Sequence, residues 1–214
     1  MKKIEKQKQV IIILVGIFVL ILGLLFISYR NVVKLVDQAT GNTTEEAKIP
    51  YKLRKNPTEI QVKYYEELEE AFLSEEQDEE LIASLVAKNF IADFFTFSNK
   101  EGSFDVGGID YLYSPDQAVG YLQAKDQFYY NFDKHIKKFK EESLEVESVE
   151  IIEVVDYGRG DTDGKIYDEY KVSANINYVN NKGFRSSDFE TIIHIKLIIN
   201  DDGRYEITRT YGEE

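Results

Sequence analysis

The residues best suited to chemistry in this sequence lie around an aromatic passage near its middle, residues 94–115. The passage reads FFTFSNKEGSFDVGGIDYLYSP and places acidic side chains among phenylalanines and tyrosines. An aspartate in an apolar setting has a raised pKa and can serve as a general base, and tyrosines beside it can line a ligand pocket. The candidate residues at the mouth of such a pocket are Asp93, Asp105, Gly107, Gly108, Asp110, Tyr111 and Tyr113.

The same passage has a structural interpretation, which the pattern favours. Phe94 and Phe97 continue the apolar stripe of a helix that we expect to end near residues 99–102. The chain then crosses to the next helix, and Gly107 with Gly108 supplies the backbone freedom of a turn or bulge. The neighbouring aromatic residues would close the open end of the fold. Because nothing distinguishes one aspartate from another, the sequence assigns no catalytic residue.

Other patterns for catalysis or metal binding are weak. The sequence has two histidines, His135 and His194, and no cysteine, so a zinc site would need mostly carboxylate ligands, which is uncommon. His135 lies among lysines and is expected in solvent, whereas His194 is expected on the surface of a strand. No nucleophile elbow or phosphate-binding glycine loop is present. The sequence predicts no cofactor and no metal ion, and it favours a protein without catalytic activity.

An acidic stretch, residues 66–80, holds nine carboxylates in fifteen residues. Such a stretch could collect divalent cations loosely. We favour a solvated helix face, because runs of like charge are usually exposed.

A membrane anchor is predicted close to the N-terminus. An uncharged apolar run of nineteen residues begins at Val10 and ends at Ser28. At about 1.5 Å per residue it spans about 28 Å, close to the hydrocarbon thickness of a bilayer. The run is too long for a signal-peptide core and no cleavage site follows it, which indicates an uncleaved signal anchor. Four lysines precede it, so the positive-inside rule places residues 1–9 in the cytoplasm as a tail and the rest outside.

The charge of the remaining chain limits its partners. The net charge is −13, and residues 1–30 contribute +4, which leaves −17 for the part outside the membrane. A domain this acidic should repel nucleic acid. An exported domain without cysteine is stabilised without disulfides, which suits a Gram-positive-like bacterium. The partners expected are the lipid bilayer and other envelope proteins, and self-association is left open.

The helical half of the domain follows a polar linker, residues 29–56, and the domain is predicted to occupy residues 57–214. A first helix is predicted to have Asn56 as its N-cap and Pro57 in its first turn. A second helix follows the acidic stretch, with a buried face that includes Leu81 and Leu85. A third begins near Ser114, and its predicted apolar side consists of Ala118, Leu122, Tyr129, Phe132, Ile136 and Phe139. Lysines at positions 137, 138 and 140 suit its C-terminal end.

After residue 142 the apolar period changes from 3.6 to 2, which predicts strands. Four runs are expected, at residues 144–157, 166–179, 184–200 and 204–211, and both faces of the third are apolar. Glycine, asparagine and aspartate occupy each connection, as hairpin turns require. Short connections make consecutive strands neighbours, so the sequence predicts an α+β fold in which three helices pack on a four-stranded antiparallel meander.

This order of elements, from about residue 57 to residue 211, resembles the NTF2-like cone fold. Behind a single signal anchor, it is similar to the outer domain of VirB8-like proteins and of their Gram-positive conjugation relatives. The resemblance implies a scaffold that binds other proteins in a conjugation or secretion complex. The same superfamily contains isomerases, dehydratases and ligand binders. The alternative function is therefore a membrane-tethered enzyme or small-ligand binder that uses the interior of the cone.

Overall fold

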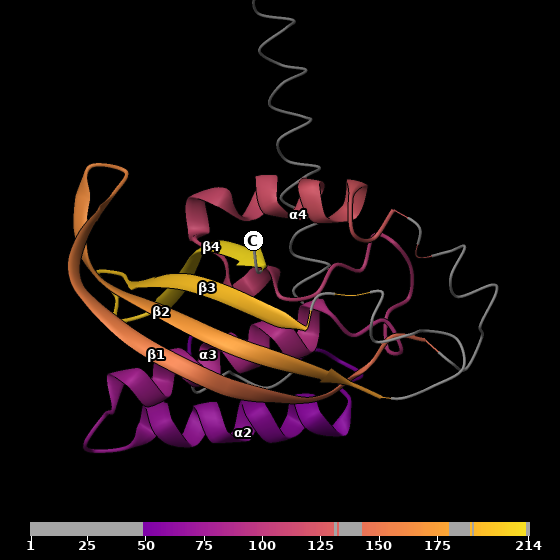
Figure 1. Cartoon of the computed structure of the whole chain (residues 1–214), viewed down its shortest axis with the longest axis horizontal. Coiled ribbons are helices and arrows are strands. Elements are labelled where there is room, and N and C mark those ends of the chain that lie inside the picture. Colours follow the sequence, from indigo (N-terminus) through magenta and orange to yellow (C-terminus); the bar gives the residue numbers. More distant parts are fainter. Residues whose placement is uncertain (1–48, 131, 133–142, 180–188, 190, 213–214) are drawn as a thin grey trace, which may run out of the picture.

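Three α-helices and one antiparallel sheet make up the regular secondary structure of the described residues (Figure 1). The computed structural model describes residues 49–130, 132, 143–179, 189 and 191–212. The elements are α2 (Glu59–Leu73), α3 (Glu79–Phe94), the 3-10 turns η1 (Ile109–Tyr111) and η2 (Ser114–Asp116), α4 (Gln117–Asp126), β1 (Val146–Thr162), β2 (Lys165–Tyr178), β3 (Ile192–Ile199) and β4 (Tyr205–Gly212). Helices therefore precede the strands, and the predicted α+β class is confirmed.

The predicted membrane helix, the cytoplasmic tail and residues 29–48 of the linker lie outside the described residues. Among the residues that the structure does describe, no helix is both long and apolar enough to cross a bilayer.

The first helix begins two residues later than predicted. Thr58 is the N-cap of α2, and its backbone N–H donates to Oε1 of Gln61 over 2.9 Å. Asn56, the predicted cap, instead donates from Nδ2 to the backbone oxygen of Asn99 over 2.8 Å. The side chain that could have capped the helix therefore holds the N-terminal segment against the loop after α3.

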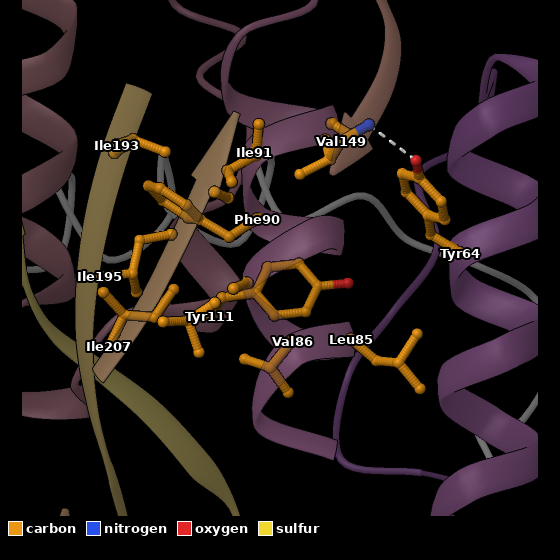
Figure 2. Packing of buried hydrophobic residues seen from close by; sticks show 14 of the residues in the cluster. Tyr64, Leu85, Val86, Phe90, Ile91, Tyr111, Val149, Ile193, Ile195 and Ile207 are labelled. Atoms are coloured by element: carbon orange, nitrogen blue, oxygen red, sulfur yellow. Dashed lines mark hydrogen bonds between the residues drawn. The ribbon is translucent and has the colours of Figure 1, made fainter. Parts of the chain in front are cut away.

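Helix α3 lies at the centre of the domain, between α2 and the sheet (Figure 2). Residues on almost every side of it are buried, and these are Ile82, Ala83, Ser84, Leu85, Val86, Ala87, Asn89, Phe90, Ile91 and Ala92. Tyr64 of α2 also reaches the sheet, because its hydroxyl oxygen accepts a hydrogen bond from the backbone N–H of Val149 over 2.9 Å (Figure 2). The helix ends at Phe94 and not near residues 99–102, because the N–H of Phe97 donates to the backbone oxygen of Leu144 over 2.7 Å.

Helix α4 is shorter than predicted and buries a different side. Tyr121 and Ala124 form its buried face, whereas Leu122 is 39% exposed. The Tyr121 hydroxyl donates to the backbone oxygen of Phe104 over 3.0 Å, which orients the helix toward the crossing passage. The helix ends at Asp126, and two members of the predicted stripe, Tyr129 and Phe132, are buried beyond that end. Ala118 is half-buried, and the last two members of the stripe, Ile136 and Phe139, lie outside the described residues together with the neighbouring lysines.

The sheet has the predicted meander order β1-β2-β3-β4 with antiparallel neighbours. Strand β1 continues to Thr162, through residues that were predicted to form a turn, because the turn itself needs only Asp163 and Gly164 at φ 54° and 77°. Three register shifts interrupt its pairing with β2, one of them at Gly158, where φ is 67°. Such bulges bend a strand, and β1 and β2 curve away from the body as a long hairpin (Figure 1).

The last residues of the predicted linker belong to the folded domain. Ile49 is 5% exposed and Tyr51 is fully buried. The Tyr51 hydroxyl donates to the backbone oxygen of Tyr205 over 2.7 Å and accepts from the N–H of the same residue over 3.0 Å, which attaches this segment to the start of β4. Residues before the predicted start at residue 57 therefore pack with the domain, which the sequence did not indicate because one aromatic side chain in a polar segment produces no periodic signal.

Candidate functional site

Two of the predicted aspartates meet two cations in a buried group, the ionic cluster of Arg54, Asp93, Lys100 and Asp105. Arg54 donates from Nη1 to Oδ1 of Asp93 over 2.9 Å and from Nη2 to Oδ2 of Asp105 over 2.8 Å. Nζ of Lys100 lies 2.5 Å from the same Asp93 oxygen, and the Lys100 side chain has no exposed surface. The cluster joins the segment before α2, the end of α3 and the crossing passage.

The two cations of the ionic cluster determine the protonation state of the Asp93 carboxyl. Burial opposes ionisation of the carboxyl, but the charges of Lys100 and Arg54 outweigh it and hold the pKa of Asp93 below its ordinary value. Burial lowers the pKa of Lys100, and Asp93 only partly offsets this. A general base at neutral pH needs a carboxyl whose pKa is raised. The shift at Asp93 has the opposite sign, so this carboxylate is suited to holding the fold together.

Gly107 and Gly108 pass directly beneath the ionic cluster. The N–H of Gly108 donates to Oδ2 of Asp93 over 2.7 Å, and the N–H of Gly107 donates to the hydroxyl oxygen of Tyr129 over 3.1 Å. A Cβ on Gly107 would lie 2.2 Å from the backbone oxygen of Asp93, where no side chain fits. Gly108 has φ 75°, a conformation that side chains disfavour. The predicted turn at Gly107 and Gly108 therefore also lies in close contact with the backbone at the end of α3.

Replacement of Gly108 by Ala is expected to destabilise the domain more than replacement of Gly203 by Ala. Both glycines have φ 75°. The strain of an alanine in this left-handed conformation is therefore expected to lower the free energy of unfolding of each variant by about 1–2 kcal/mol. The new Cβ at Gly108 would also lie 2.8 Å from Cδ2 of Phe90, whereas nothing lies within 4 Å at Gly203. Thermal unfolding followed by circular dichroism measures the difference, and equal losses for the two variants would contradict the packing argument.

The third predicted aspartate, Asp110, lies in a separate contact with Arg204, the residue that precedes β4. Its Oδ1 accepts from Nη2 of Arg204 over 3.0 Å, and its Oδ2 accepts from the N–H of Lys52 over 3.2 Å. The guanidinium of Arg204 lies 5.0 Å from the centre of the Tyr51 ring. Tyr51 also stacks on Tyr111 at a ring distance of 4.9 Å. Asp110 and Tyr111 thus secure the N-terminal segment against the turn before β4.

Tyr113 packs on the face of the sheet opposite the one that α3 covers. It forms a small apolar cluster with Tyr167 and Ile198, and its N–H donates to the backbone oxygen of Ile207 over 2.9 Å. This contact explains why both faces of the third strand are apolar, since Ile198 is buried beneath the crossing passage. The structure therefore brings Asp93, Asp105 and the glycine pair together, and it places Asp110 with Tyr111 and Tyr113 at two other positions.

Sequence reasoning missed the partners of the predicted aspartates, which are Arg54, Lys100 and Arg204. Arg54 stands in the segment interpreted as linker, and Lys100 stands in a polar stretch that resembled the end of a helix. An isolated cation in a polar segment gives no indication that it is buried. Burial of an ion pair depends on which segments the fold brings together, and the sequence pattern does not contain that information.

A separate concavity, the β4 hollow, lies between α4, the end of α3 and the outer edge of β4. Its volume is about 490 Å³. Phe90, Phe94 and Phe128 contribute aromatic surface, α4 contributes Val119 and Gln123, and β4 contributes residues 207–210. None of the seven residues predicted at a pocket mouth lines it. The hollow combines apolar walls with amide, hydroxyl and guanidinium groups, a lining that can bind an organic ligand or a peptide.

The remaining candidates for chemistry are placed as follows. His194 is half-buried in the sheet, where Nδ1 lies 2.9 Å from Oγ of its cross-strand partner Ser173 and the ring lies 5.1 Å from that of Tyr211. His135 lies outside the described residues. Across the described ranges, no group of three or more histidine, aspartate or glutamate side chains could hold a metal ion.

Comparisons with known proteins returned no relative. No protein-family model matches the chain, no curated protein matches its sequence, and no solved structure matches its fold.

Proposed function

We propose that this chain is a single-pass membrane protein whose NTF2-like domain, outside the membrane, binds other proteins of an envelope complex of the conjugation or secretion type. The observation that carries the proposal is the position of the β4 hollow against the unpaired edge of the sheet. Among the strands that the structure describes, β4 is last in the order, so one of its edges has no strand neighbour there.

Strand β4 itself lines the hollow. Residues 207–210 all contribute to it, although successive side chains of a strand point to opposite faces. The pairing of β4 with β3 shifts register between Ile207 and Arg209, so this part of the strand is bulged and its side chains do not alternate regularly. The hollow therefore lies against the bulged part of β4, the last strand in the order of the described sheet. Leu112 forms a parallel bridge with Ile207 and covers the beginning of the outer edge of β4. The part beyond it can accept an extended segment of another protein as an additional strand, as in other edge-strand complexes.

Two further features support a binding function. The candidate carboxylates of Asp93, Asp105 and Asp110 are engaged in internal ion pairs. They are therefore suited to holding the fold together, and the hollow is the surface that offers a binding site. The predicted anchor and the short predicted tail would hold the domain at the membrane surface, where envelope complexes assemble.

Photo-crosslinking in intact cells tests this function. A photoreactive amino acid replaces Val119, which lines the hollow and is 54% exposed, and in a control chain it replaces Ile152, which is 57% exposed on β1. We expect the same envelope protein to be recovered repeatedly from the Val119 chain and not from the Ile152 chain. Recovery of identical products from both positions, or of none, would contradict a binding site at the hollow.

The alternative is a small-ligand binder, and the lining of the hollow favours it as the second candidate. Aromatic rings from Phe90, Phe94 and Phe128 meet the polar groups of Gln123 and Arg209 there. Native mass spectrometry of the full chain, purified from cells in a mild detergent, distinguishes the two functions. A constant additional mass that is lost in a Phe128→Ala variant would support the ligand binder and argue against the peptide site.

A further inference from the structure

A second concavity, the α2–α3 groove, lies at the free end of the hairpin formed by these two helices. Its volume is about 340 Å³, and it is lined by the C-terminal part of α2, the connecting loop and the first turns of α3. Ala71, Leu81 and Leu85 provide apolar surface within it. The groove shares no lining residue with the β4 hollow, although α3 contributes to both.

The apolar part of the groove is incompletely covered. Leu85 is 4% exposed, but Leu81 is 47% exposed, and Leu73, which precedes the lining residue Ser74, is 57% exposed. Both leucines lie at helix ends, where the packing of α2 on α3 no longer covers them. An apolar surface of this kind beside charged groups is typical of a protein–protein contact.

The rim of the groove is acidic. Glu67, Glu70, Glu76 and Asp78 all line it. They belong to a stretch in which no lysine or arginine occurs between Lys63 and Lys88. Nζ of Lys63 lies 3.9 Å from Oε1 of Glu67, but both side chains are well exposed, and such pairs contribute little. The groove therefore presents a strongly negative potential around an apolar floor.

Helix α2 adds to this negative potential, whereas the positive N-terminal end of α3 is offset by Asp78, whose Oδ1 accepts from the N–H of Leu81 over 3.0 Å, and by two glutamates in the first turn. Glu70 lies in the last turn of α2, where the C-terminal end of the helix dipole is itself negative, and no basic residue of α2 stands in that turn. Carboxylates at this position oppose helix stability, whereas cations support it. A sequence that retains an unfavourable local arrangement often does so at a functional site. A bound cation would relieve both the dipole and the repulsion between the carboxylates.

We propose that the α2–α3 groove binds a cationic amphipathic segment of a partner protein, with aliphatic side chains on the groove floor and lysine or arginine side chains on the rim. An amphipathic helix with apolar residues three and four positions apart is the recognition mode that fits a groove between helices. The negative rim would repel anionic lipid headgroups, so the groove favours a protein partner. The inference rests on the proposed function, because it describes a second contact of the same binding module.

The test uses the full chain in nanodiscs of zwitterionic lipid, with empty nanodiscs to subtract binding to lipid. The probe is a dye-labelled peptide of 14 residues made of leucine, alanine and lysine, with its leucines three and four positions apart. A peptide of the same composition in scrambled order, and one with glutamate in place of lysine, serve as comparisons. We expect fluorescence anisotropy to show at least tenfold tighter binding of the amphipathic cationic peptide than of either comparison. Equal binding of the three peptides would overturn the proposal.

Two variants locate the binding. Neutralisation of the rim by Glu67→Gln, Glu70→Gln, Glu76→Gln and Asp78→Asn together is expected to weaken binding by about tenfold, since each exposed pair contributes little alone. Leu81→Ala is expected to weaken it by about threefold through loss of apolar contact. The control with the same change in charge carries Glu147→Gln, Glu150→Gln, Asp201→Asn and Asp202→Asn, all exposed and outside the groove. A control that weakens binding as much as the rim variant would show unspecific attraction and overturn the proposal.

Crosslinking separates failure of this inference from failure of the proposed function. A photoreactive amino acid at Leu81 is expected to capture a partner peptide rich in lysine or arginine, as identified by mass spectrometry of the crosslinked fragment. Products from the Val119 position together with none from Leu81 would leave the binding function intact and overturn the groove. Absence of products from both positions would contradict both proposals.

Discussion

Replacement of Asp93 by Asn is expected to lower the free energy of unfolding of the domain by about 3–5 kcal/mol, the range found when one partner of a buried ion pair is removed. Asp93 accepts from both cations of the ionic cluster, and the Lys100 side chain has no exposed surface. The neutral amide would leave that ammonium group buried without its direct counter-charge, with only the more distant carboxylate of Asp105 acting on it. Because small domains are stable by only about 5–15 kcal/mol, the loss should be visible as a large shift of the urea midpoint. The sequence has no tryptophan, so circular dichroism of the full chain in detergent micelles is the appropriate measurement.

The double replacement Asp93→Leu with Lys100→Met is the matched control. It removes both charges of the most buried pair, and such apolar replacements are often neutral relative to the pair they replace. We expect the double variant to recover most of the stability that Asp93→Asn loses. The exposed replacement Glu147→Gln should change stability by less than about 0.5 kcal/mol. A loss below about 1 kcal/mol in Asp93→Asn would mean that the ionic cluster does not hold the domain together.

The contribution of Asp93 should disappear in strong acid. Its pKa is lowered in the folded state by Lys100 and Arg54 against the opposing effect of burial. The unfolded chain, with an ordinary aspartate pKa of about 3.9, then binds more protons than the folded chain below that pH. Stability from this group is therefore complete above about pH 5 and declines as the pH falls further. The difference in unfolding free energy between the wild type and Asp93→Asn should narrow below about pH 4, and a constant difference would contradict the assignment.

A fragment that begins at residue 57 is expected not to fold, whereas a fragment that begins at residue 49 should fold with the secondary structure of the full chain. The shorter fragment lacks Tyr51, which is fully buried, and removal of a buried aromatic side chain costs about 3–5 kcal/mol by itself. It also lacks Arg54, so Asp93 and Asp105 would share Lys100 as their remaining cation within the ionic cluster. Circular dichroism and dye binding to exposed apolar surface measure the outcome.

The replacement Tyr51→Phe refines this comparison. It retains the ring and its stacking on Tyr111 but removes the hydroxyl that bridges the N–H and carbonyl of Tyr205. Loss of such contacts costs about 1–3 kcal/mol, so the full-length variant should be weakened and still folded. A stable fragment 57–214 would mean that residues 49–56 contribute little to the stability of the domain.

The periodic parts of the fold were predictable because burial of a repeating face leaves a repeating pattern. The meander order, the α+β class, the approximate positions of β1, β2 and β4 and the second half of the run predicted for β3 followed from alternation and turn residues. Helix ends were less predictable, since Phe97 has the spacing of a helical stripe yet leaves the helix to pair with Leu144. Side-chain spacing does not reveal where a backbone N–H finds its acceptor.

By itself, the sequence determined the class of the fold, the strand order and the acidic character of the domain, because these depend on local periodicity and on composition. The predicted anchor rests on the same kind of signal, in residues outside the described structure. Tertiary structure alone decided that Asp93 and Asp105 pair with Arg54 and Lys100, that residues 49–56 are part of the domain, and that concavities lie at the β4 edge and between α2 and α3. The reason is physical: ion pairing and burial depend on distances between segments that are far apart in the chain, and no local pattern records those distances.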